Sequence, residues 1–271
     1  MSETKNFHFE AFSSLDSSES ADFLIESMDV MYSLESIRQI KQRAIAALNL
    51  QLGDRVLEAG CGHGEDAACM GRIVGDNGYV LAIDNSKRML VEAMKRSYGK
   101  NIEYRLDEVQ AISCKDDFFS ACHADRLLVG HPDFEAIFQE LLRVLKPKGR
   151  ISITDVDALS IIIHPHNKTT DAILKELTSR FVNPSMGRML LPLFHKNHLQ
   201  DIQFIPEIST IRSYETLKKV FKFDDIIDQA IKNGKITAIE AENWQREIHE
   251  SDQKNDFLYA IMFFTVVGSK P

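Results

Sequence analysis

Short apolar runs alternate with amphipathic segments along most of this chain. Seven apolar runs predict buried strands, at residues 55–59, 79–84, 101–106, 118–124, 150–154, 202–211 and 257–268. Apolar positions at helical spacing predict helices within 21–49, after residue 64, after residue 86, at about 134–145, from about 183, and at about 214–233 and 237–251. Strands that alternate with helices in this way are typical of an α/β fold with a mostly parallel sheet.

The first strand leads into a glycine-rich turn. Three glycines stand in a Gly-x-Gly-x-Gly pattern over Gly60–Gly64, and Glu58 lies two residues before the first of them. Glycine permits a positive φ and lets a ligand approach the backbone closely. The second strand ends in Asp84, 20 residues after Gly64. An acid at about this distance accepts hydrogen bonds from a ribose in nucleotide-binding folds.

The turn does not match the pyrophosphate-binding pattern. That pattern is Gly-x-Gly-x-x-Gly, whereas here the third glycine comes one residue early and Glu65 takes its place. Together with Glu58, this acid would repel a phosphate at the start of the helix. The two acids favour a ligand that carries an ammonium group and no phosphate, which describes S-adenosylmethionine.

Three motifs, in order, resemble those of class I S-adenosylmethionine-dependent methyltransferases, in their small-molecule branch. The motifs are Val56–Gly64, Ala82–Leu90 and Leu141–Arg150, and the resemblance covers roughly residues 30–271. It implies a Rossmann-like, doubly wound sheet of seven strands in which strand seven is antiparallel. It also implies methyl transfer to a small molecule, with S-adenosylmethionine as cofactor and S-adenosylhomocysteine as product.

Helical segments at both ends of the chain are expected to cover this sheet. We expect an N-terminal tail and helices over residues 1–49 and a methyltransferase domain over 50–271. A helical insertion at about 214–251 separates the last two predicted strands and would form a cap. Residues 1 to about 20 are rich in Ser and Glu and predict a flexible tail or a lid.

The resemblance implies a set of cofactor-binding residues at the ends of the first four strands. These are Glu58, Gly60, Cys61, Gly62, Asp84, Asn85, Met89, Asp107, Glu108, Val109 and Ala124. Met89 would lie near the adenine, and Asp107 would meet the adenine amino group. The chain departs from the family at Leu106, where glycine is usual before the acid, and at Ser120, where aspartate is frequent.

The substrate residues are less well defined. The candidates are Tyr32, Arg126, His131, Asp157, His164 and Arg188. Gly130 takes the place of a histidine that is common in the family, so the catalytic residues stay unassigned, with His131, Asp157, His164 and Tyr32 as candidate bases. His164 and His166 lack a neighbouring Cys or Glu-x-x-His frame, so no metal is expected.

Composition narrows the choice of partners. The 271 residues carry a net charge of −8, and the pI is about 5.6. This balance argues against nucleic acid or an anionic membrane as the main partner. The four cysteines form no C-x-x-C pair, and the acidic start Met1–Thr4 lacks an apolar signal core. We therefore expect a cytoplasmic protein with free thiols and a small-molecule substrate, and both a monomer and a homodimer stay open.

Three alternatives remain open on the sequence. An NAD-dependent oxidoreductase is opposed by the glycine spacing and by the acids at Glu58 and Glu65. A non-catalytic module that binds S-adenosylmethionine would have a blocked or absent substrate cavity beneath the cap. A nucleic-acid or protein methyltransferase is disfavoured by the acidic balance and by the lack of an Asn/Asp-Pro-Pro-Tyr/Phe signature.

Overall fold

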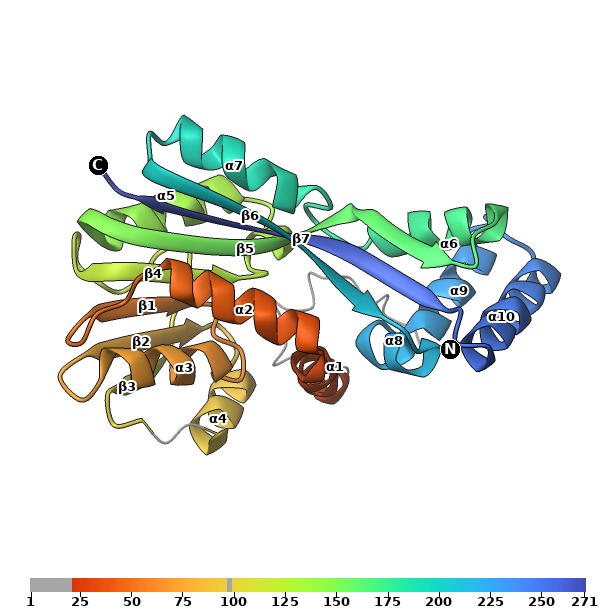
Figure 1. Ribbon diagram of the computed structural model, residues 1–271, viewed down its shortest axis with the longest axis horizontal. Helices are drawn as coiled ribbons and strands as arrows, with labels where there is room; N and C mark the ends of the chain where they lie inside the picture. Colours follow the sequence, from red (N-terminus) through yellow and green to blue (C-terminus); the bar gives the residue numbers. More distant parts are fainter. Residues whose placement is uncertain (1–20, 97–98) are drawn as a thin grey trace.

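The computed structural model describes residues 21–96 and 99–271. The Ser-rich segment 1–20, for which a tail or lid is expected, lies outside these residues. The described chain forms an elongated molecule with two lobes, and three long strands run from one lobe into the other (Figure 1).

One mixed sheet of seven strands organises the larger lobe, in the order β3-β2-β1-β4-β5-β7-β6. The strands are β1 (Arg55–Ala59), β2 (Tyr79–Asp84), β3 (Ile102–Leu106), β4 (Phe119–Asp125), β5 (Leu145–His164), β6 (Gln200–Ile211) and β7 (Leu258–Ser269). The first five strands pair in parallel, and β7 is antiparallel to both of its neighbours. The predicted fold class, with an antiparallel seventh strand, is confirmed.

Helices cover both faces of the sheet. They are α1 (Ala21–Ser33), α2 (Glu35–Ala47), α3 (Glu65–Val74), α4 (Lys87–Arg96), α5 (Phe134–Val144), α6 (Lys168–Thr178), α7 (Met186–Lys196), α8 (Tyr214–Val220), α9 (Phe223–Lys232) and α10 (Ala238–Gln253). On one face, the Ser152 hydroxyl of β5 donates to the Ala44 carbonyl of α2 at 3.2 Å. On the other face, a Cβ on Gly268 of β7 would lie 3.1 Å from the Phe194 ring of α7. The two helices therefore lie on opposite sides of the same strands, which makes the sheet doubly wound.

Strand β5 is much longer than the sequence pattern predicts. The apolar run suggests an end at Thr154, but the strand continues to His164 after an irregularity between Asp157 and Ile162. Asp155 and Asp157 resemble residues that follow a strand, yet both are buried within it. The Asp155 carboxylate accepts a hydrogen bond from the Val129 amide at 3.1 Å, so a specific partner makes its burial possible.

The far halves of β5, β6 and β7 carry the smaller lobe, together with α6, α8, α9 and α10 (Figure 1). The sequence pattern does not predict α6, and the single helix expected at 214–233 is divided into α8 and α9 at Phe221 and Lys222. Trp244 is fully buried and stacks on Phe223, and its indole donates to the Thr170 hydroxyl at 2.9 Å. These aromatic side chains form the core of this lobe, and that core is continuous with the hydrophobic core of the sheet.

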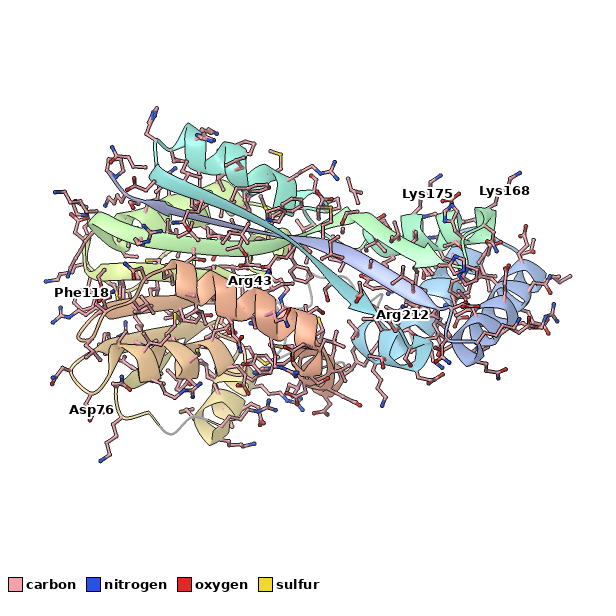
Figure 2. All side chains as sticks on the ribbon, viewed as in Figure 1. Arg43, Asp76, Phe118, Lys168, Lys175 and Arg212 are labelled. Carbon is pink, nitrogen blue, oxygen red and sulfur yellow. The ribbon has the colours of Figure 1, made fainter. Side chains whose placement is uncertain are left out.

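Charged side chains lie along the outside of both lobes. Lys168 and Lys175 project from α6 at the outer edge of the smaller lobe, and Arg212 lies where β6 ends (Figure 2). Arg212 donates to the carbonyls of Phe257 at 2.8 Å and Asn255 at 2.6 Å, which ties the end of β6 to the start of β7.

Two expectations from composition concern the whole chain. All four cysteines are free, as predicted. Among the helices that the structure describes, none combines the length and the apolar composition needed to cross a bilayer. The cytoplasmic location remains a prediction, and the choice between a monomer and a homodimer stays open.

Candidate functional site

The glycine turn is a left-handed backbone segment fastened to β2. Gly60, Gly62 and Gly64 all have positive φ angles, of 72°, 50° and 85°. The amides of Gly60 and Cys61 both donate to the Ile83 carbonyl at 2.9 Å. Asp84 braces the turn as well, since one carboxylate oxygen accepts from the Gly62 amide at 2.9 Å. Side chains with a Cβ are disfavoured at these angles, which explains the glycine pattern.

A cavity of about 180 Å³ opens at this turn. Six of the residues expected to bind the cofactor line it: Gly60, Gly62, Asp84, Asn85, Met89 and Val109. They come from the carboxyl ends of β1 and β2, the start of α4, and the loop after β3. This edge is where open α/β sheets bind their ligands. The predicted cofactor residues therefore converge on one space, although their role in binding remains a prediction.

Five of the predicted cofactor residues do not line this space: Glu58 and Cys61 line an adjoining compartment, and Asp107, Glu108 and Ala124 line neither. The Asp107 carboxylate is engaged in its own loop, where it accepts from the Ser113 amide at 2.9 Å and the Ser113 hydroxyl at 3.1 Å. Glu108 is exposed, and Ala124 is fully buried within the sheet. Leu106, which stands where the family usually has glycine, is thus followed by a carboxylate that is bonded within its own loop.

A smaller polar compartment adjoins the cavity. Glu58 and Cys61 line it, together with Lys41, Asp66 and Asp125. The Lys41 ammonium forms ion pairs with Asp66 and, at 2.6 Å, with Asp125. Burial alone would lower the pKa of Lys41, but the two carboxylates raise it above its usual value. The compartment therefore presents both signs of charge, as the amino and carboxylate groups of an amino acid require.

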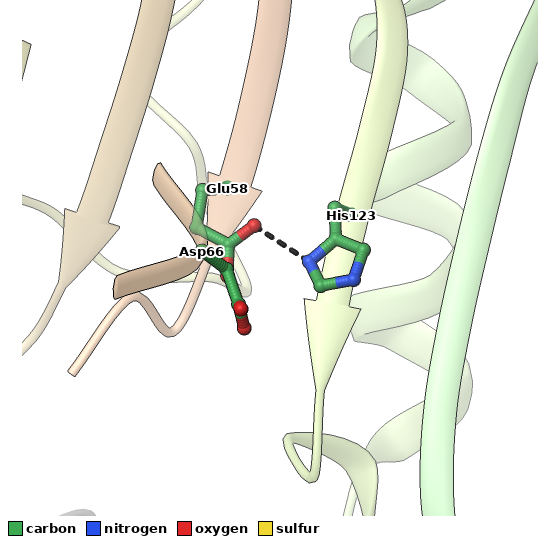
Figure 3. Close-up of side chains that lie close together, drawn as sticks. All are labelled: Glu58, Asp66 and His123. Carbon is green, nitrogen blue, oxygen red and sulfur yellow. Dashed lines mark hydrogen bonds and ion pairs between the residues drawn. The ribbon is translucent and has the colours of Figure 1, made fainter. Parts of the chain in front are cut away.

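Glu58 forms a buried pair with His123 of β4 (Figure 3). A Glu58 carboxylate oxygen lies 2.7 Å from the His123 Nδ1. Burial raises the pKa of Glu58 to about 7, against the opposing effect of His123. Burial alone would lower the pKa of His123, but Glu58 raises it to about 9. The two groups thus share a buried proton in the hydrogen bond between the His123 Nδ1 and Glu58.

Asp66 lies close to this pair. Among the described residues, Glu58, Asp66 and His123 have ligand atoms within 4.8 Å of one another. All three side chains already have partners, since the His123 Nδ1 bonds to Glu58 and Asp66 forms an ion pair with Lys41.

Lys41, Asp66, His123 and Asp125 are absent from the set of residues proposed on the sequence. His123 and Asp125 lie at the carboxyl end of β4, which is a general indicator of a ligand site. Lys41 is on α2, remote in sequence from both of its partners, so no local pattern reveals it.

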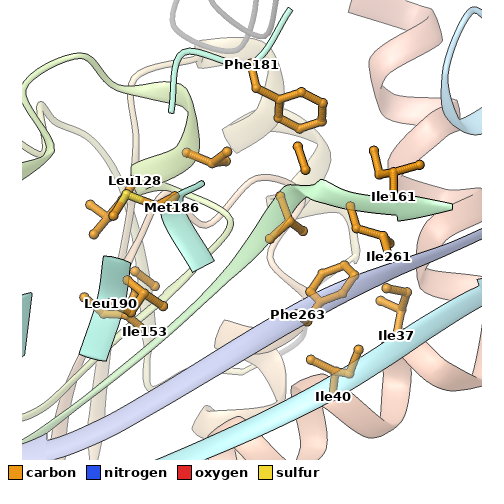
Figure 4. Packing of buried hydrophobic residues seen from close by; sticks show 14 of the residues in the cluster. Ile37, Ile40, Leu128, Ile153, Ile161, Phe181, Met186, Leu190, Ile261 and Phe263 are labelled. Atoms are coloured by element: carbon orange, nitrogen blue, oxygen red, sulfur yellow. The ribbon is translucent and has the colours of Figure 1, made fainter. Parts of the chain in front are cut away.

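The other half of the cavity is apolar. One wall is formed by alternate residues of β7, namely Tyr259, Ile261 and Phe263, which share one face of the strand. Met28 and Met31 of α1 also line the cavity. Figure 4 shows Ile261 and Phe263 with Ile37 and Phe181, which line the cavity too. The cavity thus runs from the polar glycine turn to an apolar space between the lobes.

Three of the predicted substrate residues lie at these spaces. Arg126 and His131 line the main cavity, and Tyr32 and Arg126 line the polar compartment. Burial lowers the pKa of His131, so this imidazole is neutral at pH 7. Its Nδ1 lies 3.4 Å from the Gln110 side-chain nitrogen.

The structure does not bring the other three to the cavity. Asp157 pairs with Arg188 of α7, at 2.8 Å between a carboxylate oxygen and a terminal nitrogen. Val156 lines the cavity, so its neighbour Asp157 points to the opposite face of β5. His164 is exposed at the far end of β5. The unexpected length of β5 carries His164 past the ligand-binding edge, whereas Asp157 and Arg188 pair on the face of the strand that points away from the cavity.

The glycine turn, braced by an acid at the end of β2, lies beside a polar compartment and an apolar cavity. This arrangement is typical of a nucleoside-binding α/β fold. Residues 50–258 match the family model described as "Methyltransferase domain". The chain belongs to this family. The prediction of a class I S-adenosylmethionine-dependent methyltransferase is confirmed, and the NAD-dependent alternative is set aside.

Individual relatives are distant. The chain is 24% identical, over 90% of its length, to an uncharacterized 37.1 kDa protein in transposon TN4556 of Streptomyces fradiae, and it covers 70% of that protein. It is 31% identical over 43% of its length to the 2-phytyl-1,4-naphtoquinone methyltransferase of Synechococcus elongatus, of which it spans 52%. The crystal structure of the YcgJ protein from Bacillus subtilis superimposes with a TM-score of 0.63 at 19% identity, over 86% of this chain and 98% of that one. This last likeness shows the fold alone.

Proposed function

We propose that this protein transfers the methyl group of S-adenosylmethionine to an apolar small molecule. The observation that carries the proposal is the continuity of the cavity. Gly60, Gly62 and Asp84 stand at one end of it, and Ile261 and Phe263 stand at the other. A polar cofactor and an apolar acceptor would thus meet within one enclosed space.

The residues at the polar end fit the parts of the cofactor. Each carboxylate oxygen can accept more than one hydrogen bond, so Asp84 retains capacity for ribose hydroxyls beyond its bonds to the backbone. Met89 and Val109 offer apolar contacts to an adenine ring. Asp66 and Glu58 suit an ammonium group, and Lys41 and Arg126 suit a carboxylate.

When bound, the cofactor supplies an electrophilic methyl group on a sulfonium. The protein's contribution is to hold the acceptor in line with that methyl and to exclude water from the space. Positioning of this kind reaches effective molarities of about 10⁵–10⁸ M in well-oriented systems. No nucleophile from the protein is required.

The chemistry of the cavity wall favours a largely hydrocarbon acceptor. Apolar side chains from α1, β6 and β7 surround its inner half, and the smaller lobe closes it with Val220 and Phe221. Burial of apolar surface would supply most of the binding free energy for such a molecule. The relative from Synechococcus elongatus is named a 2-phytyl-1,4-naphtoquinone methyltransferase, which is consistent with this class.

His131 is the residue best placed to remove a proton from an oxygen or carbon acceptor. It lines the cavity, and its lowered pKa leaves the imidazole neutral and able to accept a proton at pH 7. Tyr32, the other candidate base near the site, lines the polar compartment, and burial raises its pKa. A phenol with a raised pKa is a poor base because it keeps its proton.

The cavity also bears on the non-catalytic alternative. A module that only senses S-adenosylmethionine would have no need of an acceptor space beneath the smaller lobe. The apolar half of the cavity therefore supports a transferase over a sensor.

The test is methyl transfer from labelled S-adenosylmethionine to a panel of apolar phenols and hydroquinones. The wild-type protein is compared with Ile261→Trp, which fills the apolar half. The control is Ile239→Trp, at a side chain that is exposed on α10. We expect transfer by the wild type and Ile239→Trp, and loss of transfer in Ile261→Trp with S-adenosylhomocysteine binding retained. Full activity in Ile261→Trp, or no transfer to any acceptor by a wild type that binds the cofactor, would contradict the proposal.

A further inference from the structure

Tyr259 places a phenol in the apolar wall of the cavity. It lies on β7 opposite Ile163 of β5 and Ile211 of β6, and only 1% of its surface is exposed. Its hydroxyl has no hydrogen-bond partner among the described residues. A buried hydroxyl without a partner costs about 1–3 kcal/mol, so such a group calls for an explanation.

The other hydroxyls around the apolar half are already bonded. Ser27 donates to the Val220 carbonyl at 2.8 Å, and the hydroxyls of Ser36 and Ser209 lie 2.9 Å apart. Of the side chains with unpartnered buried polar atoms in the described chain, Tyr259 is the one that lines the main cavity. Among the described residues that line this cavity, the Tyr259 hydroxyl is therefore the buried polar atom without a partner.

The surroundings of Tyr259 keep it a neutral donor. Burial raises the pKa of this phenol far above its usual value, and no charged neighbour contributes to that change. The Phe221 ring, which also lines the cavity, has its centre 5.7 Å from that of Tyr259. The phenol thus keeps its proton at every physiological pH and has one O–H to donate.

We propose that Tyr259 is a specificity-determining residue that donates a hydrogen bond to a carbonyl or hydroxyl oxygen of the methyl acceptor. This inference rests on the proposed function and narrows its substrate class. The acceptor is an apolar molecule that carries such an oxygen on the part that lies between the lobes. Apolar molecules without this oxygen would leave the hydroxyl unpaired and would bind more weakly.

Matched pairs of probes test this directly. The pairs are 1-indanone and indane, 1-tetralone and tetralin, and benzophenone and diphenylmethane, each differing by one carbonyl oxygen. Their binding is measured by calorimetry, and by ligand-observed NMR for the weakest, on protein saturated with S-adenosylhomocysteine. The variants are Tyr259→Phe and the control Tyr214→Phe. Tyr214 is equally buried and equally lacks a hydroxyl partner among the described residues, but it lies in the aromatic core of the smaller lobe.

We expect the wild type to prefer at least one ketone over its hydrocarbon by roughly threefold to tenfold, the range of a net hydrogen bond. Tyr259→Phe should abolish that preference and leave S-adenosylhomocysteine affinity unchanged, and Tyr214→Phe should retain both. The inference is overturned if the wild type prefers no ketone or if Tyr259→Phe keeps the preference. Failure of the proposed function would differ, because the wild type would then transfer no methyl group to any acceptor in the labelled assay, whereas the ketone preference and its loss in Tyr259→Phe are measured by binding alone.

Discussion

The buried pair of Glu58 and His123 should make the stability of the fold depend on pH in a distinctive way. Glu58→Gln keeps the shape of the side chain and removes its charge. Since Glu58 is what raises the pKa of His123 above its usual value, the variant should leave His123 neutral across the physiological range.

The magnitude follows from the pKa of His123, which is about 9 in the fold against an ordinary value of 6.5. At about 1.4 kcal/mol per pKa unit, this difference corresponds to roughly 3 kcal/mol of unfolding free energy. Because the folded pKa is the higher one, this contribution is fully present below pH 6.5 and is lost as pH rises through 9.

The assay is urea unfolding of the wild type and Glu58→Gln at pH 6, 7, 8 and 9, with an NMR titration of His123. Relative to the variant, the wild type should lose roughly 3 kcal/mol or more of unfolding free energy between pH 6 and 9. Glu242→Gln on the exposed face of α10 is the control and should follow the wild type. Parallel pH profiles for wild type and Glu58→Gln, or a wild-type His123 that titrates at or below 6.5, would refute this reasoning.

Two further predictions separate the cofactor site from its surroundings. Gly62→Ala should destabilise the protein by about 1–2 kcal/mol, the backbone cost of a left-handed residue, because the Met28 methyl that lies 2.6 Å from the new Cβ ends a flexible side chain and can move aside. Gly62→Ala should also weaken S-adenosylhomocysteine binding. The control is Gly234→Ala, at a φ of 66°, where an added Cβ would have no atom within 4 Å; it should show only the backbone cost in thermal melts. Arg188→Ala should cost about 1.5–3 kcal/mol in urea unfolding, since it leaves the buried Asp157 unpaired, with cofactor affinity unchanged. A fall in that affinity would place Arg188 at the site after all.

The cofactor half of the site is predictable because its signals are local. The bounds of β1 and β2 agree with the apolar runs, and the glycines and Asp84 stand within 25 residues of one another. Their geometry depends on backbone conformation, which the residue types at Gly60 and Gly62 indicate directly.

The acceptor half is not predictable in this way because it depends on long-range packing. Tyr259 and Met28 share a cavity although more than 200 residues separate them. The sequence pattern predicts the end of β5 too early because an acid such as Asp157 usually lies outside a buried strand. Here Arg188 pairs with Asp157 and allows its burial, so the strand continues. The partners of Lys41 likewise become visible only once α2 lies against α3 and β4.

The most direct test of the central claim is calorimetric titration with S-adenosylhomocysteine, run in parallel with NAD⁺, on the wild type and Asp84→Ala. We predict micromolar binding of S-adenosylhomocysteine alone. The loss of charged hydrogen bonds at Asp84 should weaken it by about 1.5–3 kcal/mol, or roughly 10- to 150-fold. Binding of NAD⁺ in place of S-adenosylhomocysteine, or an unchanged affinity in Asp84→Ala, would contradict the assignment of the cofactor site.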